Sequence, residues 1–344
     1  MLHNELLTDL YQSAISVPPE SFQDSVFTKI DRVIGFDRAW WGIMSHNQDS
    51  FDLHSSYRHE LPLEFEEHWQ EVRSDDALAV YAHSQPRTTV CFDEKALHST
   101  PGLASLNTEH DLRHALCTSV FLPDRQSFLF ISLFRSGSDA RPFNSDEVYL
   151  KQLLTPHLYS CWRTNLYADI ERSRNANQSK DVASAFVDRN GRIVYADSAF
   201  GDLIAERWPT WNGRDIPIQL QETRKISKNS LSKKSIGFFV SQQYAGGLVR
   251  LDIRKLSLID KLTNREREIA RCFALGQSYK ETAILMKLSP ATVRHYLRVI
   301  YEKLEINDKA ELVRIVDRYD HDVDFSQSST NLFSNRNIDF LGNG

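Results

Sequence analysis

The sequence predicts an α+β protein that ends in an all-helical region, and three observations support this. Apolar residues make up 41% and charged residues 25% of the 344 residues, which is the balance of an ordinary globular protein. Short segments rich in aromatic and β-branched residues alternate with helical segments as far as Arg254. Beyond that point three helix-capping boxes follow one another closely, at Thr263–Glu266, Ser278–Glu281 and Asp308–Glu311.

In the first part of the chain, helices flank the expected strands. One helix is expected over residues 21–34, and a second over residues 145–172, with a kink at Pro156. Helices on either side of short strands favour a mostly antiparallel sheet. The strand segments are residues 39–44, 88–92 and 127–134.

A second small unit is expected after residues 172–180, which lack large apolar side chains and are interpreted as a linker. Asn190-Gly191 is a strong hairpin signal between two short strands at 185–187 and 192–195. A short helix is expected after Asp197. Further segments are two strands at 236–240 and 248–254, and a polar basic loop at 223–235.

Targeting and redox signals are few. The longest apolar run, residues 128–134, is far shorter than the roughly 20 residues that cross a bilayer, so we expect no membrane contact. The N-terminus carries no readable secretory signal. The four cysteines form no CxxC pair, which favours reduced thiols in the cytoplasm and argues against a zinc or disulfide framework. We therefore expect no cofactor and no metal.

Charge is distributed unevenly along the chain. Residues 1–180 carry 16 lysines and arginines against 25 aspartates and glutamates, whereas residues 220–319 carry 20 against 11. An acidic N-terminal part and a basic C-terminal part favour binding of a polyanion by the C-terminal part alone.

Residues 290–304 are predicted to form the second helix of a helix-turn-helix. The preceding turn is short, with Ser289 as N-cap and Pro290 at the first helical position. A buried stripe is expected at Val293, Leu297, Ile300 and Leu304. The opposite, exposed face then offers three side chains for base edges in the DNA major groove: Arg294, His295 and Arg298.

Phosphate contacts are expected around the start of this helix, because unpaired amides and the helix dipole favour an anion there. The alternative is that the bundle mediates protein contacts alone. The expected phosphate contacts are Lys280, Ser289, Thr292, Tyr296 and Lys303.

The segment from Leu262 to Val313 resembles the LuxR/FixJ-type DNA-binding domain in the order and spacing of its motif residues. The resemblance implies that the helix at 290–304 reads DNA. It also implies that a fourth helix forms the dimer contact. Thr282 stands where the family usually has isoleucine, and Tyr296 where it has histidine. The expected dimer contacts are Leu312, Ile315 and Val316.

Two segments in the first part of the chain carry further family resemblances. With ISLFR at 131–135, Pro142-Phe143, Ser145-Asp146-Glu147 and Pro156-His157-Leu158, residues 1–170 are similar to a GAF-like sensory domain with a C-terminal linking helix. The segment AFVDRNGRIVYADSAF at 185–200 looks like the opening of a PAS domain, so residues 181–256 are expected to form a PAS-like unit. The LuxR-type domain is expected over residues 258–319 and a disordered tail over residues 320–344. Trp40, Tyr57, Trp69 and Tyr81 are the candidate ligand-pocket residues.

Together these features predict a cytoplasmic, dimeric, sequence-specific transcription regulator that binds double-stranded DNA. Its expected partners are a second copy of the chain, an unidentified small molecule and RNA polymerase. One alternative is an acyl-homoserine lactone receptor, because Tyr57, Trp69 and Asp75 or Asp76 resemble that family's pocket. An enzyme that uses the GAF-like cleft is disfavoured, since no nucleophile, base and orienting group occur together.

Two further site hypotheses carry less weight. His110 and His114, four residues apart, are candidate metal ligands on a helix face, but spacing indicates no third ligand. Cys91 and Cys117 are candidate redox sensors, although nothing nearby is expected to lower a thiol pKa.

Overall fold

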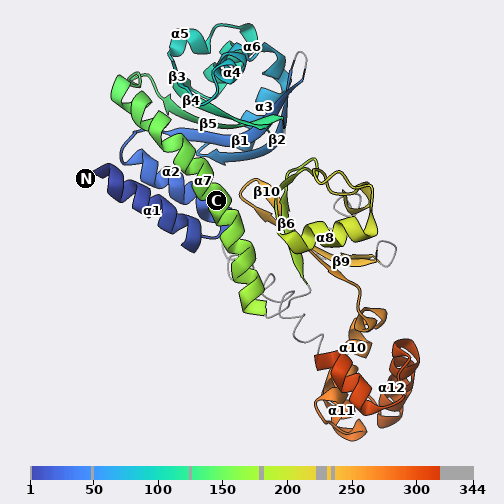
Figure 1. Cartoon of the computed structure of the whole chain (residues 1–344). Coiled ribbons are helices and arrows are strands. Elements are labelled where there is room, and N and C mark those ends of the chain that lie inside the picture. Colours follow the sequence, from blue (N-terminus) through green and yellow to red (C-terminus); the bar gives the residue numbers. More distant parts are fainter. Residues whose placement is uncertain are drawn as a thin grey trace, which may run out of the picture.

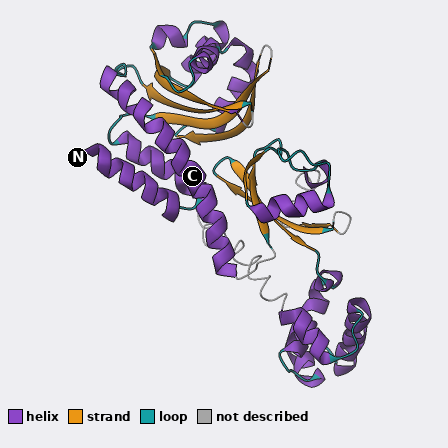
Figure 2. Ribbon diagram, viewed as in Figure 1, coloured by secondary structure: helices purple, strands orange, loops and turns teal. Residues whose placement is uncertain are grey.

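A computed structural model of the chain describes residues 2–47, 50–123, 126–177, 182–221, 231–233 and 237–317. It contains two antiparallel five-stranded sheets with their helices, followed by a helical region (Figures 1 and 2). The α+β prediction is therefore confirmed. Among the described residues, no helix is both long enough and apolar enough to cross a membrane.

The first sheet has the strand order β2-β1-β5-β4-β3. Alternate residues of a strand face opposite sides, so the adjacent Trp40 and Trp41 enter different cores. Helices α1, α2 and α7 cover the face of Trp41, and the shorter helices cover the face of Trp40 (Figure 1). The strands are β1 (Arg38–Asn47), β2 (Ser50–His59), β3 (Thr89–Phe92), β4 (Leu112–Leu122) and β5 (Ser127–Ser136), and the helices are α1 (Leu2–Ser16), α2 (Pro19–Asp31), α3 (Leu63–Val72), η1 (Arg73–Asp75), α4 (Ala77–Ser84), α5 (Glu94–Leu97), α6 (Pro101–Glu109) and α7 (Ser145–Asn177).

The second sheet has the strand order β7-β6-β10-β9-β8. Its first strand in the sequence, β6, pairs with its last strand, β10, just as β1 pairs with β5 in the first sheet. Helix α8 covers one face and contributes Phe200 and Ile204 to the core. The helix expected after Asp197 is present, and Asp197 caps it, because its carboxylate accepts the Phe200 amide at 2.7 Å. The elements are β6 (Ala183–Val187), β7 (Ile193–Ala196), α8 (Ser198–Arg207), β8 (Leu231–Lys233), β9 (Phe238–Ala245) and β10 (Leu248–Lys255).

The helical region begins after β10 and has its own apolar core. The capping boxes that begin at Thr263 and Ser278 are both present, and Gly276 ends a helix with φ +92°. The elements are η3 (Leu258–Lys261), α10 (Asn264–Ala274), α11 (Tyr279–Met286), α12 (Pro290–Leu304) and a last helix over residues 309–317.

Several sequence predictions need correction. The expected linker at 172–180 is helical as far as Asn177, because Arg174 pairs with Glu171 and with Asp197 of the second unit. The expected loop at 223–235 contains strand β8 at 231–233, and its remaining residues lie outside the described part. The expected tail at 320–344 also lies outside it. Strands β2 and β4 and helix α1 were not predicted.

Buried ion pairs join α7 to the second sheet. Arg250 of β10 donates to Asp169 at 2.6 Å and to the hydroxyl of Ser173 at 2.7 Å, both on α7. The same guanidinium donates to Asp252 at 3.0 Å. Because a buried guanidinium needs several acceptors, this arrangement fixes the end of α7 against β10.

The β9–β10 hairpin also contacts the first sheet and its helices. Gln23 of α2 donates to the carbonyl of Gly246 at 2.9 Å. Gly246 and Gly247 both have positive φ, and a Cβ on Gly247 would lie 2.6 Å from the carbonyl oxygen of Ser56. The turn therefore requires glycine for its conformation and for the close approach of β2.

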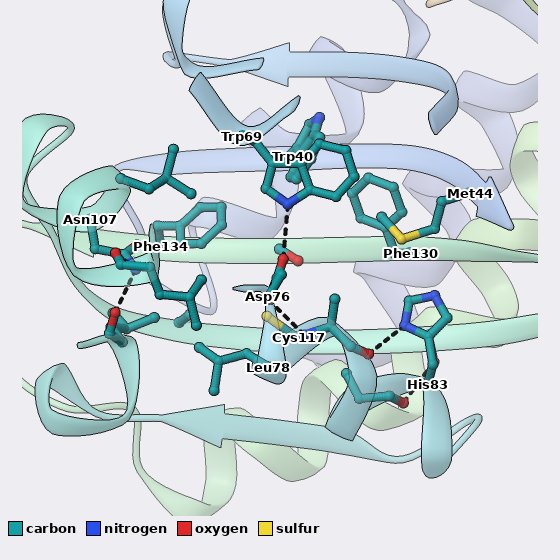
Figure 3. Close-up of a pocket in the computed structure, with 18 of the residues that line it drawn as sticks. Trp40, Met44, Trp69, Asp76, Leu78, His83, Asn107, Cys117, Phe130 and Phe134 are labelled. Carbon is teal, nitrogen blue, oxygen red and sulfur yellow. Dashed lines mark hydrogen bonds between the residues drawn. The ribbon is translucent and has the colours of Figure 1, made fainter. Parts of the chain in front are cut away.

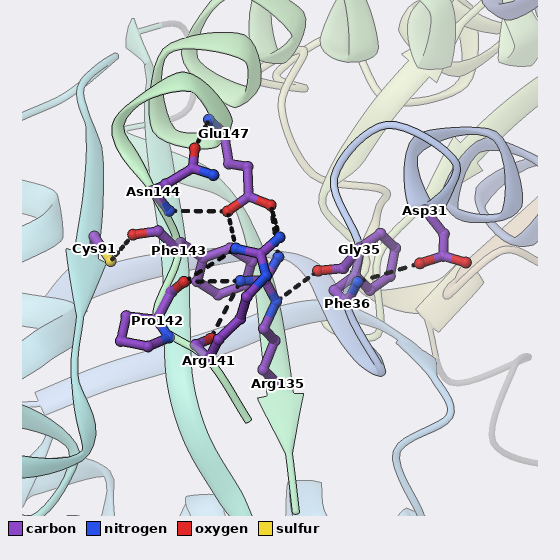
Figure 4. Close-up of polar contacts among 10 residues, drawn as sticks. All are labelled: Asp31, Gly35, Phe36, Cys91, Arg135, Arg141, Pro142, Phe143, Asn144 and Glu147. Atoms are coloured by element: carbon purple, nitrogen blue, oxygen red, sulfur yellow. Dashed lines mark hydrogen bonds and ion pairs between the residues drawn. The ribbon is translucent and has the colours of Figure 1, made fainter. Parts of the chain in front are cut away.

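A second buried ionic cluster holds the start of α7 (Figure 4). Glu147 accepts hydrogen bonds from Arg135 at 2.8 Å, Arg141 at 2.6 Å and the backbone amide of Asn144 at 2.9 Å. Arg135 also donates to the carbonyl of Gly35 at 2.7 Å. The cluster thus connects the end of β5, the start of α7 and the segment between α2 and β1.

This cluster determines how Glu147 titrates. Burial alone raises the pKa of its carboxyl, but the hydrogen bonds from Arg141, Arg135 and the Asn144 amide outweigh burial and lower the pKa from 4.5 to about 2. Because the folded pKa lies below the ordinary one, the ionised group stabilises the fold above pH 4.5. That contribution is lost as the pH falls from 4.5 to about 2.

We predict that Glu147→Gln lowers the free energy of unfolding by about 3 kcal/mol at pH 7, because it leaves two guanidinium groups without their shared anion. Urea titrations of both proteins between pH 7 and pH 3 measure this. The difference should shrink below pH 4.5. Glu94→Gln is the control, because the Glu94–Arg113 pair is exposed and should contribute little. A loss for Glu147→Gln that does not change with pH would contradict the assignment.

Candidate functional site

The turn between α11 and α12 has the geometry of a helix-turn-helix. Lys287 ends α11 in the left-handed region at φ 53°, and α12 begins two residues after Leu288. The Ser289 hydroxyl accepts the amide of Thr292 at 3.1 Å, and Pro290 occupies the first turn. The predicted cap and start of this helix are confirmed.

One face of α12 is buried and the opposite face is exposed. Its buried residues are those predicted from helical spacing: Val293, Leu297, Ile300 and Leu304. Arg294, His295 and Arg298 are all exposed. A row of solvent-facing basic side chains near the start of a helix has the arrangement that major-groove readers use.

Weak local contacts hold these three side chains on the surface. The Arg294 guanidinium lies 5.6 Å from the centre of the Tyr279 ring. Arg298 lies 3.4 Å from the Nδ1 atom of His295 and 3.8 Å from the carboxylate of Glu302. Such exposed contacts cost little free energy to break, so the three side chains are available to bind a polyanion.

The predicted phosphate contacts lie in different environments. Lys280 and Ser289 are exposed, Thr292 is partly exposed, and Tyr296 packs in part against the helical core. Lys303 donates to both carboxylate oxygens of Glu266 at 2.7 Å. The ammonium of Lys303 therefore joins α12 to α10 in this structure.

The predicted dimer contacts on the last helix need correction. Leu312 is 0% and Val316 is 2% exposed, and both belong to the core of the helical region. Ile315 is partly buried against the same core. The fourth helix that the resemblance implied as a dimer contact instead turns these residues inward.

A second candidate site is a cavity of about 70 Å³ in the first unit, between the sheet and helices α3, α4 and α6 (Figure 3). Its lining is mainly apolar and aromatic, as in most small-molecule sites. The lining includes Trp40, Met44, Phe65, Trp69, Phe130 and Phe134, with polar groups from Asp76, His83, Asn107, Thr118 and Ser132.

Asp76 is the acidic group of this cavity. One carboxylate oxygen accepts the indole N–H of Trp69 at 2.8 Å, and the other accepts the amide of Ala79 at 2.8 Å (Figure 3). Burial raises the pKa of Asp76, although these hydrogen bonds oppose the shift. The carboxylate caps α4 and orients Trp69 at the same time.

The predicted pocket residues divide between two environments. Trp40 and Trp69 line the cavity. Tyr57 does not, because it packs against Phe27 on the opposite face of the sheet, where burial raises its pKa to about 12. Tyr81 is also outside the lining and is 49% exposed.

The earlier histidine and cysteine hypotheses are not supported by the geometry. His110 ends α6 and His114 lies in β4, where its Nε2 atom is 3.1 Å from the carbonyl of Ala140, so the two do not share a helix face. Burial raises the pKa of the Cys91 thiol and raises that of Cys117 to about 11. Both thiols are therefore poor nucleophiles.

Comparison with known proteins identifies the helical region. Residues 260–316 match the family described as "Bacterial regulatory proteins, luxR family". The C-terminal region is a LuxR-type helix-turn-helix domain. It is also 38% identical over 52 residues to the transcriptional regulatory protein DesR of Bacillus subtilis. That alignment covers 15% of the chain and about a quarter (26%) of DesR, so it concerns this domain alone.

Solved structures show only loose similarity to the chain. SdiA in complex with octanoyl-rac-glycerol is 14% identical with a TM-score of 0.35, over 92% of this chain and 94% of that one. CepR2 of Burkholderia cenocepacia, an N-acylhomoserine lactone dependent LuxR family transcription factor, is 16% identical with a TM-score of 0.38, over 49% of this chain and 97% of that one. A phycoerythrobilin-bound GAF domain from a cyanobacterial phytochrome is 13% identical with a TM-score of 0.33, over 48% and 95%.

One position in the LuxR-type domain contains a polar group without a partner. Thr282, which replaces the usual isoleucine, is 0% exposed on α11. Its hydroxyl forms no hydrogen bond within the described part of the chain. A buried hydroxyl that has lost its water contacts destabilises a domain.

We predict that Thr282→Val raises the free energy of unfolding of this domain by about 1 kcal/mol, because it removes the unpaired hydroxyl at nearly constant volume. Thermal unfolding of the two proteins measures the effect. Thr282→Ser is the matched control: it keeps the hydroxyl, loses a buried methyl group, and should be less stable than the parent. A stabilised serine variant would show that the methyl group, not the hydroxyl, is strained.

Proposed function

We propose that the chain is a dimeric, sequence-specific transcription regulator whose DNA binding responds to a small molecule in the cavity of the first unit. The observation that carries this proposal is the exposed basic face of α12, within a segment that matches the luxR family. An internal structural bundle has no need for three solvent-facing basic residues at the start of its third helix.

Each DNA contact follows from chemistry and exposure. Arg294 and Arg298 can each donate two hydrogen bonds to the edge of a guanine, and His295 can contact a neighbouring base. Ser289, Thr292 and the amides that begin α12 suit a phosphate, and Lys280 suits another. Tyr296 lies at the border of the exposed face of α12, and its hydroxyl is a further proposed phosphate contact. We leave Lys303 out of the proposed interface because Glu266 neutralises it.

The cavity suits a small, mostly apolar ligand with one hydrogen-bond donor for Asp76. A volume of about 70 Å³ is small, so a larger ligand requires movement of α3, α4 or α6. An acyl-homoserine lactone is the alternative ligand class that Trp69 and Asp76 favour, since its amide N–H is such a donor. Trp69 and Asp76 would both change partners when a ligand enters.

We further propose the division expected from the sequence, with a GAF-like unit at 1–170, a PAS-like unit at 181–256 and the DNA-binding domain at 258–319. Helix α7 then carries the signal between the first two units. Its start is held by Glu147 and its end by the Asp169–Arg250 pair. A ligand-driven shift of the sheet would reach the second unit through this helix.

The dimer contact is proposed on the outer face of α7. Tyr149, Leu153 and Tyr167 are 64%, 50% and 50% exposed. Tyr149 and Tyr167 are five helical turns apart, so their side chains leave the helix in the same direction. Leu153 is about one turn after Tyr149 and points to nearly the same side. Exposed apolar residues aligned on a 33-residue helix favour packing against the same helix of a second copy.

We predict that Arg298→Ala weakens binding to the preferred site by roughly 5- to 150-fold and relaxes base selectivity at one position. The site is first selected from random duplex DNA with the full chain, and binding is then measured by fluorescence anisotropy. Arg207→Ala, on α8 of the second unit, is the control and should bind normally. Failure of the full chain to select any sequence would overturn the proposed function.

Lys280→Ala in the same assay separates phosphate contacts from base contacts. It should weaken binding to all sequences alike and reduce the slope of log affinity against log salt by about one. Lys303→Ala should instead lower thermal stability, because it leaves Glu266 buried without its cation. A selective loss at one base on Lys280→Ala would contradict its assignment to phosphate.

We predict that Leu153→Asp converts the dimer to a monomer, because it places a charge in the centre of the proposed α7 contact. Sedimentation velocity measures the oligomeric state. Ile218→Asp is the control, since Ile218 is 65% exposed and belongs to the second unit, outside α7. A dimer that survives Leu153→Asp would place the contact elsewhere.

A further inference from the structure

Three metal-ligating side chains meet beside the cavity, where two helices approach each other. His68 belongs to α3, and Glu109 and His110 lie at the end of α6. Their ligand atoms all lie within 4.8 Å of one another. The Nδ1 atom of His68 is 3.2 Å from a Glu109 carboxylate oxygen, and the two imidazole rings are 5.6 Å apart.

One nitrogen of each imidazole lacks a hydrogen-bond partner. The Nδ1 atom of His68 and the Nε2 atom of His110 are both buried and form no hydrogen bond with any of the described residues. The whole His110 residue is only 6% exposed. Buried polar atoms of this kind are uncommon in native proteins and call for an explanation such as an ion.

The other nitrogen of His68 has a polar contact of its own. Its Nε2 atom lies 3.2 Å from the hydroxyl of Ser105, which can accept the ring N–H when Nδ1 binds an ion. Nδ1 faces the Glu109 carboxylate at 3.2 Å. Hydrogen bonding of the outer ring nitrogen is the usual second contact of a metal-bound histidine.

The ring of His110 is held in place beside the other two side chains. It packs edge-to-face on Phe65 at 5.2 Å, which fixes its orientation. A ring that is already oriented loses less conformational entropy when it binds a metal.

We propose that His68, Glu109 and His110 bind one zinc ion, with the fourth position left for water or an external ligand. Two imidazoles and one carboxylate suit zinc and are a poor set for Mg²⁺ or Ca²⁺, which prefer oxygen ligands throughout. Of the earlier candidate pair, only His110 takes part. Its partner is His68, which the sequence places 42 residues away.

The ion would tie together two walls of the cavity. Phe65 and Trp69 line it from α3, and Leu103 and Leu106 line it from α6. Zinc at the end of α6 would hold these walls at a fixed separation. The proposed DNA binding does not depend on this site, because the α12 face lies in another domain, whereas the ion would leave α4 as the cavity wall free to move for a larger ligand.

The test is calorimetric titration of the full chain, treated with a chelator and dialysed, first with Zn²⁺ and then with Mg²⁺. We expect one Zn²⁺ per chain, a rise in melting temperature with Zn²⁺, and no response to Mg²⁺. Co²⁺ should give a visible absorption spectrum typical of a site with protein nitrogen ligands. His68→Gln and His110→Gln should each weaken Zn²⁺ binding at least about tenfold.

Matched variants separate the site from incidental histidine binding. His59→Gln removes a similar pair, since His59 lies 2.8 Å from Asp24. That pair has no third ligand among the residues that the structure describes, so the variant should bind Zn²⁺ normally. Glu109→Gln is the variant least able to disturb folding, because Glu109 is 62% exposed, and it should also weaken binding. Unchanged affinity in Glu109→Gln and His110→Gln, or equal loss in His59→Gln, would overturn the proposal.

Discussion

Buried guanidinium groups need hydrogen-bond acceptors around them, and this need determines how α7 and the two sheets are assembled. Arg135 and Arg250 are both nearly buried, and each reaches acceptors on segments distant in sequence. One group fixes the start of α7 and the other fixes its end. Because neither charge can lose its partners cheaply, α7 and the two sheets hold a defined relation. Any signal proposed to pass along α7 must move these ion pairs together.

Local signals in the sequence were sufficient to predict the helices of the DNA-binding domain and the buried face of α12. Its capping boxes, the glycine with positive φ and the spacing of the buried stripe on α12 all depend on residues within a few positions of each other. The dimer contact that the resemblance implied at Leu312 and Val316 failed. A family pattern does not decide which face of a helix packs inward, because the tertiary fold does.

The first two units were less predictable because their determinants are distant in sequence. Strands β2 and β4 contain polar residues such as His54 and Thr118 that are buried by contacts across the sheet, so their apolar pattern is weak. The sequence predicted both Tyr57 and Trp69 as pocket residues. Trp69 lines the cavity, but the alternation of side chains along β2 places Tyr57 on the opposite face of the sheet. The cluster around His110 was partly visible, but its partner His68 comes from another helix.

The glycine turn between β9 and β10 has a consequence for how this chain tolerates change. Gly247 approaches the backbone of β2 so closely that a single added methyl group would collide with it. Insertions or larger residues at this tip would push the sheets apart, while each sheet kept its own core. Natural variants of the protein should therefore keep this hairpin at constant length and vary elsewhere on the surface.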